Sequence, residues 1–407
     1  MHRAALLAVL LIAPAAALAD WPGWRGSNGD GVVTDPTVPL QWSATENVLW
    51  KVPVPGTGHS SPIVAGRKLF VTTCVDNDRL LLCYDRETGQ ELWRATVVTA
   101  PQEGMHKNNT PASATPVTDG ARAWVTFLAD GAITATCLDA AAGSKVWQRQ
   151  FPGFVSQHGF CGTPILSGDL LIVNGDSDGD AFLAGLDKAT GEVRWKVPRP
   201  NRTRSFSTPV LIDVREKKQI VLAGSKCITA FDPATGELVW TVASPTDKFA
   251  ATVAYAGGLV IATGTSPVST ITAIRPDGTG DVTESHVAWS ASKGAAYVPS
   301  PLAVGDAVFV QSDPGPASFL DTKTGKVYWT ERLGRHHHAS PLLVNGLVYS
   351  LADDGTMFVV KPSPAFKVLA RNALGEDCHA TPAVVAGRIY VRSIHHLWCI
   401  GTAPASR

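Results

Sequence analysis

The stretch LDKATGEVRW, residues 186–195, decides the fold, because versions of it recur along the whole chain. It combines an apolar residue, an Asp, a Thr-Gly pair and a final Trp at fixed spacing. Similar stretches occupy residues 84–93, 231–240 and 320–329, and a looser one occupies 138–147. Gly adopts φ > 0 readily and Asp can hydrogen-bond its own backbone, so the part from Asp to Gly predicts a tight turn between two strands.

A second pattern marks where each repeat begins. It is a Ser/Thr-Pro pair, or its equivalent, followed by an apolar run and a Gly. The eight starts lie 40 to 54 residues apart, at Ser61, Thr115, Thr163, Thr208, Thr252, Ser300, Ser340 and Thr381. A period in this range is typical of propellers and solenoids.

Each repeat predicts four short strands. In the first repeat they cover residues 61–64, 69–73, 80–84 and 91–94, which indicates a four-stranded antiparallel meander. Such a unit cannot bury both faces alone, so the units must stack. The sequence therefore predicts an all-β protein with an eight-bladed β-propeller. A linear solenoid is the alternative, and it would need capping repeats at its ends.

The two ends of the repeat region favour a closed ring. The eighth repeat stops after its third strand, at residues 397–401, whereas residues 47–51 form an unattached fourth strand with Trp50 in the motif position. We expect this N-terminal strand to complete the last blade and hide the sheet edges. The expected organisation is an N-terminal segment packing on the ring (20–45), the propeller (46–401) and a short tail (402–407).

Residues 1–19 have the pattern of a secretory signal peptide. A short basic start precedes an apolar stretch, and Ala17-Leu18-Ala19 fits a cleavage site. A membrane anchor is the alternative, but the stretch is near the lower length limit for a span and contains Pro14. No Cys follows Ala19, so we expect a periplasmic or secreted protein that is not a lipoprotein. No other segment predicts a transmembrane span.

Charge and cysteine content restrict the partners. The chain has 35 basic and 35 acidic residues and no basic block, which argues against nucleic acid and anionic membranes as main partners. The seven cysteines are an odd number, and the sequence leaves their pairing open. Cys83, Cys137 and Cys399 occupy equivalent apolar strand positions and are predicted to fill the core.

The recurring turn and its Trp resemble the repeat of the pyrroloquinoline-quinone-like propeller family over residues 46–401. The resemblance implies that the Trp side chain docks between neighbouring blades, a structural role expected for Trp50, Trp93, Trp147, Trp195, Trp240, Trp289 and Trp329. Arg275 and Lys361 replace the motif Asp in blades five and seven, and Leu369 replaces the Trp. Those two blades are expected to be the least regular.

The family implies two functions. One branch consists of quinoprotein dehydrogenases, which bind the quinone and Ca²⁺ on the propeller axis. The other is non-catalytic and is similar to the accessory propeller lipoprotein of the outer-membrane barrel-assembly machinery. The start at residues 21–26 also resembles uncharacterised exported propellers. This chain has no adjacent cysteines, and it lacks the long insertions that form the cofactor lid of the dehydrogenases. The motifs therefore support neither a quinone nor a divalent metal cofactor, and both stay open as alternatives.

Two functional hypotheses follow from these comparisons. The first is an exported, monomeric, non-catalytic binding or scaffold protein with a protein partner or small ligand in the cell envelope. The alternative is a periplasmic oxidoreductase that depends on a quinone or a metal.

Candidate site residues lie just before the first strand of certain blades. His59, Cys161, His338 and His379 each stand two residues before the repeat Ser/Thr, and His106 and His158 lie in neighbouring loops. The first strand of a propeller blade is the innermost, so these loops should form the rim of one channel mouth. Imidazoles there suit an anionic ligand or Zn²⁺ or copper, with His59, His338 and His379 as the candidate metal ligands. The alternative is a wet mouth that tolerates any polar residue.

One further pattern suggests a cation. Asp176, Asp178 and Asp180 alternate as in a Ca²⁺ loop, but no Glu stands six residues after Gly179 and the flanks are strands. A polar hairpin turn is the predicted structure.

Overall fold

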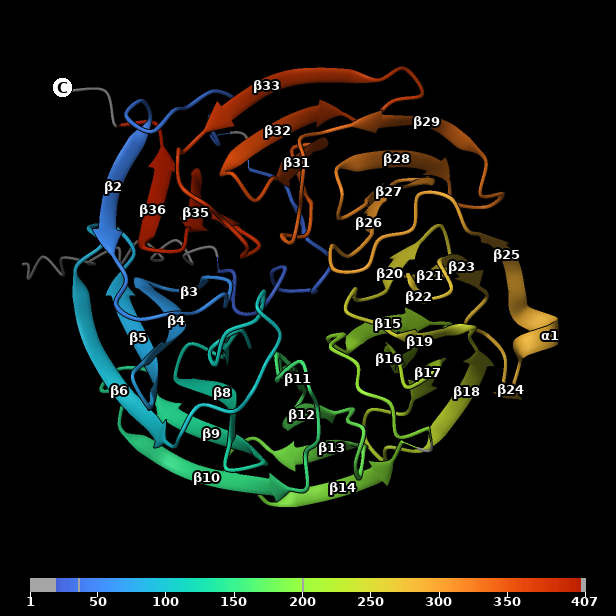
Figure 1. Cartoon of the computed structure of the whole chain (residues 1–407), viewed down its shortest axis with the longest axis horizontal. Helices are drawn as coiled ribbons and strands as arrows, with labels where there is room; N and C mark the ends of the chain where they lie inside the picture. Colours follow the sequence, from blue (N-terminus) through green and yellow to red (C-terminus); the bar gives the residue numbers. More distant parts are fainter. Residues whose placement is uncertain (1–19, 36, 200, 404–407) are drawn as a thin grey trace, which may run out of the picture.

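The computed structural model describes residues 20–35, 37–199 and 201–403. Eight antiparallel sheets are arranged radially around a central axis (Figure 1). The predicted fold, an all-β propeller with eight four-stranded blades, is confirmed. The expected signal peptide lies outside the described residues, as do the last four residues of the chain.

Blades one to four contain the following strands. Blade one has β3 (Ile63–Ala65), β4 (Lys68–Val75), β5 (Asp78–Asp85) and β6 (Glu91–Thr99). Blade two has β7 (Val117–Thr118), β8 (Arg122–Ala129), β9 (Ala132–Asp139) and β10 (Lys145–Pro152). Blade three has β11 (Ile165–Ser167), β12 (Leu170–Gly175), β13 (Phe182–Asp187) and β14 (Val193–Pro198). Blade four has β15 (Val210–Val214), β16 (Lys217–Gly224), β17 (Cys227–Phe231) and β18 (Leu238–Ala243).

Blades five to eight complete the ring. Blade five has β20 (Ala254–Ala256), β21 (Leu259–Gly264), β23 (Thr270–Ile274) and β25 (Val287–Ala291). Blade six has β26 (Leu302–Val304), β27 (Ala307–Gln311), β28 (Pro316–Asp321) and β29 (Val327–Arg332). Blade seven has β30 (Leu342–Val344), β31 (Leu347–Leu351), β32 (Thr356–Lys361) and β33 (Lys367–Ala373). Blade eight has β34 (Ala383–Val385), β35 (Arg388–Arg392), β36 (His396–Gly401) and β2 (Val48–Pro53).

The N-terminal strand closes the ring as expected. β2 pairs antiparallel with β36 (Figure 1). In this pairing Trp50 lies opposite Cys399. The last blade therefore contains strands from both ends of the repeat region. This arrangement leaves no unpaired fourth position in blade eight and ties the first blade to the last.

The degenerate repeat of blade five has an altered outer edge. Where blades one, two, three, four and six have the turn that ends in the motif Gly, the chain forms β24 (Gly280–Asp281) and the four-residue α1 (Thr283–His286). β24 adds in parallel to β18 of blade four. A small separate sheet of β19 (Thr246–Lys248) and β22 (Ser266–Pro267) lies nearby, and β1 (Val32–Val33) adds in parallel to β30 of blade seven.

The motif turns connect neighbouring blades through their Trp and Gly residues. The motif glycines have φ between 70° and 75°. Each leaves room for the Trp of the preceding blade; an added Cβ on Gly191, for example, would lie 2.6 Å from the Trp147 ring. The indole N–H of Trp195 then donates to the Pro233 carbonyl of the next blade at 3.2 Å. Trp50, Trp147, Trp289 and Trp329 donate in the same way, to the carbonyls of Arg86, Lys188, Thr322 and Ser363.

Two motif tryptophans differ from this pattern. Trp240 faces the altered turn of blade five, and its indole N–H donates instead to Oε1 of Gln219 at 2.9 Å. The Trp93 indole lies against Gly143, but its N–H is buried without a partner.

The repeat Ser/Thr residues form a belt of hydrogen bonds around the channel. In six places the backbone N–H of one repeat's Ser/Thr donates to the hydroxyl oxygen of the next, at 2.8–3.1 Å. These bonds join the innermost strands of adjacent blades. The Ser/Thr of the repeat motif is therefore an inter-blade acceptor.

The segment before β1 crosses one end of the channel. Trp21 forms a bridge with Val64 of blade one, and the buried Arg25 donates to the carbonyls of Pro301 and Pro341 in blades six and seven. Trp24 lines the cavities on both sides of this segment. The N-terminal segment thus forms a floor across the channel. In the described part of the chain, no helix approaches the length or apolar character needed to cross a bilayer.

Candidate functional site at the channel mouth

A cavity of about 430 Å³ fills the channel between the floor and the opposite mouth. Trp24 lies at its floor, and hydroxyls of the repeat Ser/Thr belt line its wall. The rim consists of the loops that precede the innermost strands. All eight positions that stand two residues before the repeat Ser/Thr line this cavity: His59, Ser113, Cys161, Phe206, Ala250, Val298, His338 and His379. The structure therefore brings the sequence-aligned positions together.

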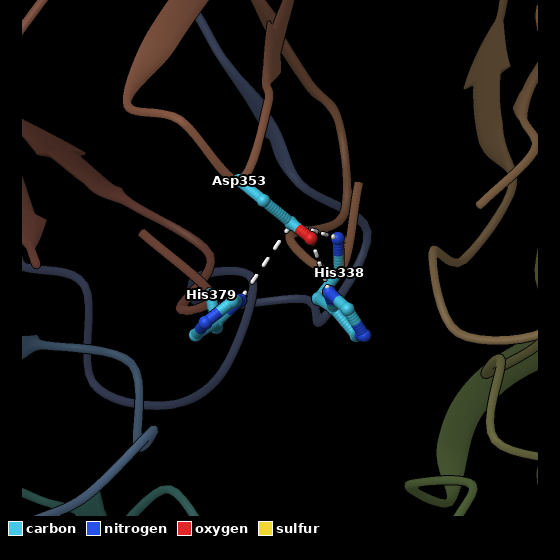
Figure 2. A group of neighbouring side chains, drawn as sticks. All are labelled: His338, Asp353 and His379. Carbon is cyan, nitrogen blue, oxygen red and sulfur yellow. Dashed lines mark hydrogen bonds and ion pairs between the residues drawn. The ribbon is translucent and has the colours of Figure 1, made fainter. Parts of the chain in front are cut away.

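A His–Asp–His cluster joins blades seven and eight at the rim. Figure 2 shows His338 and His379, from the loops before β30 and β34, on either side of Asp353 from the loop between β31 and β32. Nδ1 of His338 lies 2.7 Å from Oδ2 of Asp353, whose Oδ1 accepts the His338 backbone N–H at 2.9 Å. Nδ1 of His379 lies 3.6 Å from Oδ1 of Asp353.

The ionisation of this cluster follows from its contacts. Burial favours neutral His338, but the hydrogen bond to Asp353 and the negative charges of Asp353 and Asp313 together outweigh burial and raise the His338 pKa. Burial also favours a neutral carboxyl at Asp353, but the two imidazoles outweigh it and hold the Asp353 pKa well below its usual range. The carboxylate therefore has one strongly held imidazole partner and a second one close by.

His59 of blade one stands beside this cluster. Its ring centroid lies 4.7 Å from that of His379. Burial, assisted by His379 and Arg392, lowers the pKa of His59 to about 3, so its imidazole is neutral at physiological pH. Arg392 lies beneath it and donates to Ser60 and Thr72.

A second group occupies the mouth at blades two to four. The rings of His106 and His158 stack with centroids 5.6 Å apart, and Nε of Arg204 approaches Nδ1 of His158 at 2.9 Å. The loop after β6 brings Asn108 to the mouth, where its amide nitrogen lies 3.4 Å from Nε2 of His338. This loop, which joins blades one and two, thus contacts blade seven.

Cys161 and the three alternating aspartates are the remaining candidate residues. Cys161 lines the cavity, and burial raises its thiol pKa to about 12, so the thiol is protonated. The seven cysteines are all free. The three alternating aspartates each pair with an arginine instead of converging: Asp176 with Arg199, Asp178 with Arg204 and Asp180 with Arg202.

Sequence reasoning missed Asp353 and Asn108. Asp353 belongs to a turn between the second and third strands of its blade, where Asp is common for local reasons. His337 is a different case, because it belongs to the same His run but is fully buried, with its ring nitrogens facing the carbonyls of Leu351 and Leu333. It is a core histidine.

Among the described residues, the lining of this cavity offers hydroxyl, amide and imidazole groups but no permanent cation to the quinone of the dehydrogenase branch. Pyrroloquinoline quinone carries three carboxylates, and buried anions need cationic or hydrogen-bonding partners. In the described part of the chain, no Arg or Lys lines the cavity. His59, on the rim, is neutral at physiological pH. We therefore assign no quinone-dependent reaction to this cavity.

Comparison with known proteins identifies the relatives of this chain. A family model described as "Outer membrane protein assembly factor BamB" matches residues 31–114, 77–315 and 225–362. The BamB of Burkholderia pseudomallei is 34% identical over 108 residues, which are 26% of this chain and 28% of that protein. The BamB of Shewanella oneidensis is 24% identical over 255 residues, 56% of this chain and 59% of that protein. The chain thus spans less than two thirds of the length of both relatives.

Solved structures share the fold. BamB from Moraxella catarrhalis superposes with a TM-score of 0.63 at 16% identity, over 88% of this chain and 98% of that chain. The quinohemoprotein alcohol dehydrogenase from Comamonas testosteroni superposes with a TM-score of 0.66 at 13% identity, over 97% and 82%. At such identities these likenesses describe architecture alone. The family match, in contrast, runs from residue 31 to residue 362. The protein belongs to the PQQ-repeat propeller family whose model is described as outer membrane protein assembly factor BamB.

Proposed function

We propose that this protein is a non-catalytic binding and scaffold protein that acts in outer-membrane protein assembly, in the periplasm and as a monomer. The family match over residues 31–362 carries the proposal. The signal-peptide pattern of residues 1–19 supports the compartment. Propeller folds serve many functions, so the choice between them depends on relatives and on the site, not on architecture.

The face we propose for a partner or ligand is the channel mouth. The loop after β6 contributes the exposed polar side chains of His106 and Asn108 to its rim. The cavity behind this rim ends at Trp24, so a ligand would reach it from the mouth side. Concave sites with a few converging polar groups are the usual places for ligands.

Deleting the gene and replacing it with variants tests this proposal. We expect deletion to reduce the amount of folded β-barrel proteins in the outer membrane, and the wild-type gene to restore it. A variant with His106→Ala and Asn108→Ala should restore it poorly. A matched double variant on another exposed surface, Asp213→Ala with Lys218→Ala, should restore it fully, since this pair is an exposed ion pair of β15 and β16.

The two parts of the proposal fail separately. Unchanged barrel protein levels after deletion would contradict the role in assembly. Full restoration by the His106/Asn108 variant would contradict the use of the channel mouth and leave the role in assembly intact. Cell fractionation and the mass of the mature N-terminus test the compartment.

A further inference from the structure

We propose that His338, Asp353 and His379 form a binding site for a divalent first-row transition metal ion such as Zn²⁺. The inference goes beyond the proposed function and does not depend on it. Nδ1 or Nε2 of each imidazole and one carboxylate oxygen supply the ligand atoms, which all lie within 4.8 Å of one another. Among the described residues, this is the group in which three metal-ligating side chains converge.

The geometry requires only small side-chain movements. Ligand atoms bound to Zn²⁺ at about 2.0–2.1 Å in a tetrahedron are about 3.3 Å apart. The Nδ1–Oδ2 distance between His338 and Asp353 is 2.7 Å, and the Nδ1–Oδ1 distance between His379 and Asp353 is 3.6 Å. The observed distances lie on both sides of the required value. The three side chains come from loops, where rotations of this size do not disturb the sheets.

A second observation indicates an unfilled position in the cluster. Nδ1 of His379 is buried from solvent and has no hydrogen-bond partner. Buried polar atoms nearly always have a partner, so an unpartnered imidazole nitrogen directed at a carboxylate calls for an ion or another ligand. The His338 backbone N–H donates a hydrogen bond to Asp353. This bond orients the carboxylate, as outer hydrogen bonds orient metal ligands.

The donor set selects the class of metal. Two imidazoles and a carboxylate suit Zn²⁺ and its first-row neighbours, whereas Ca²⁺ and Mg²⁺ prefer oxygen ligands alone. The His338 and His379 side chains line the cavity. A three-ligand ion would therefore keep an open position toward the channel mouth, available to water or to an anionic group of a ligand.

Calorimetric titration of the untagged full chain with Zn²⁺ tests the proposal. The protein should be purified without metal-affinity resin, because the run of residues 336–338 could retain metal from it. We expect one Zn²⁺ per chain and a rise in melting temperature, because an ion that joins blades seven and eight stabilises the folded state. Ca²⁺ at the same concentration should produce neither effect.

Variants locate the ion. Asp353→Asn and His379→Gln are close in size to the native residues, and each should weaken Zn²⁺ binding by roughly 100-fold or more. His336→Ala is the matched control, because His336 belongs to the same His run and lines the same cavity but lies outside the cluster. It should bind Zn²⁺ as the wild type does. The metal-free melting temperature of each variant shows whether it folds.

Three results would overturn the proposal. The first is the absence of stoichiometric Zn²⁺ binding by the wild type. The second is binding that both folded cluster variants retain, which would indicate adventitious binding elsewhere. The third is loss of binding in His336→Ala alone. None of these results bears on outer-membrane protein levels, so they leave the proposed function untouched.

Discussion

The indole of Trp195 in blade three lies directly against Gly236 in the motif turn of blade four. A Cβ added to Gly236 would lie 2.5 Å from the indole Cε3 atom. The same turn has φ of 74° at Gly236 and provides the Pro233 carbonyl that accepts the Trp195 N–H. One turn thus joins two strands of its own blade and also holds the Trp indole of the preceding blade. This double role explains why Asp, Gly and Trp recur together.

Gly236→Ala should therefore destabilise the protein more than an ordinary turn substitution. The new methyl group requires a positive φ for a non-Gly residue and displaces the Trp195 ring. We expect a loss of about 2–4 kcal/mol in the free energy of unfolding, measured by denaturant titration. Gly168→Ala is the matched control, because Gly168 has φ of 59° but nothing within 4 Å of an added Cβ. Its expected loss is about 1–2 kcal/mol. Equal losses would show that the Trp–Gly contact contributes little.

The Ser/Thr belt predicts a specific effect of Thr252→Val. The Thr252 hydroxyl accepts the Thr208 backbone N–H at 2.9 Å, and Thr252 is almost fully buried. Valine keeps the shape and leaves that N–H unsatisfied, so the melting temperature should fall, with a cost of about 1–3 kcal/mol. Thr252→Ser retains the hydroxyl and should recover most of the lost stability. If Thr252→Val is as stable as the wild type, the hydrogen bond from the Thr208 N–H does not contribute to stability.

The fold could be predicted because its information is local and repeated. The Asp-to-Gly turn, the following Trp and the Ser/Thr-Pro start each reappear in register, so errors in one repeat are corrected by the others. Ring closure was predictable because Trp50 lies in a fourth strand that no third strand precedes in the sequence. The path of the N-terminal segment was not predictable in the same way, because its residues do not recur and the partners of Arg25 lie in blades six and seven.

The candidate site was predictable only in part. Aligning the repeats placed His59, His338 and His379 at one mouth, because equivalent loop positions of a closed ring converge. The alignment could not select Asp353, since similar turn aspartates elsewhere, such as Asp187, cap their own turns. Nor could it show that Asn108 reaches His338, because the path of a long loop depends on tertiary contacts and not on its repeat position.

Asp85 gives a pH-dependent prediction for the motif turn. Burial of its carboxyl acts to raise the Asp85 pKa, but hydrogen bonds from Arg67, Thr88 and Glu87 outweigh burial and hold the pKa below its ordinary value. A carboxyl with a lower pKa in the folded state stabilises the protein above its unfolded pKa of about 3.9, and this contribution is lost as pH falls through the folded pKa.

Asp85→Asn should therefore be less stable than the wild type by about 1 kcal/mol at pH 7, and the difference should shrink toward pH 3. Denaturant titrations of both proteins across this range measure it. Asp213→Asn is the control, since Asp213 pairs with Lys218 in an exposed ion pair. It should differ little from the wild type at neutral pH. A constant difference between Asp85→Asn and the wild type across the range would show that the charge of Asp85 does not contribute.

Arg25 tests how the channel floor is held. Its side chain is 1% exposed and donates to the carbonyls of Pro301 and Pro341 at 3.2 and 3.4 Å. Burial lowers its pKa to about 10, so the guanidinium remains charged at pH 7. Among the described residues it has no ion-pair partner. Arg25→Ala removes both hydrogen bonds and leaves a void, so we expect a loss of about 2–4 kcal/mol and faster amide exchange in residues 21–31.

Arg25→Met separates volume from charge. Methionine fills most of the space and removes a buried charge that Asp30 stabilises only at a distance, so its stability should lie within about 1 kcal/mol of the wild type. Hydrogen exchange measured by mass spectrometry should show the floor segment protected in Arg25→Met and exposed in Arg25→Ala. If both variants lose protection equally, the two hydrogen bonds to the proline carbonyls hold the floor, and the packing of the side chain does not.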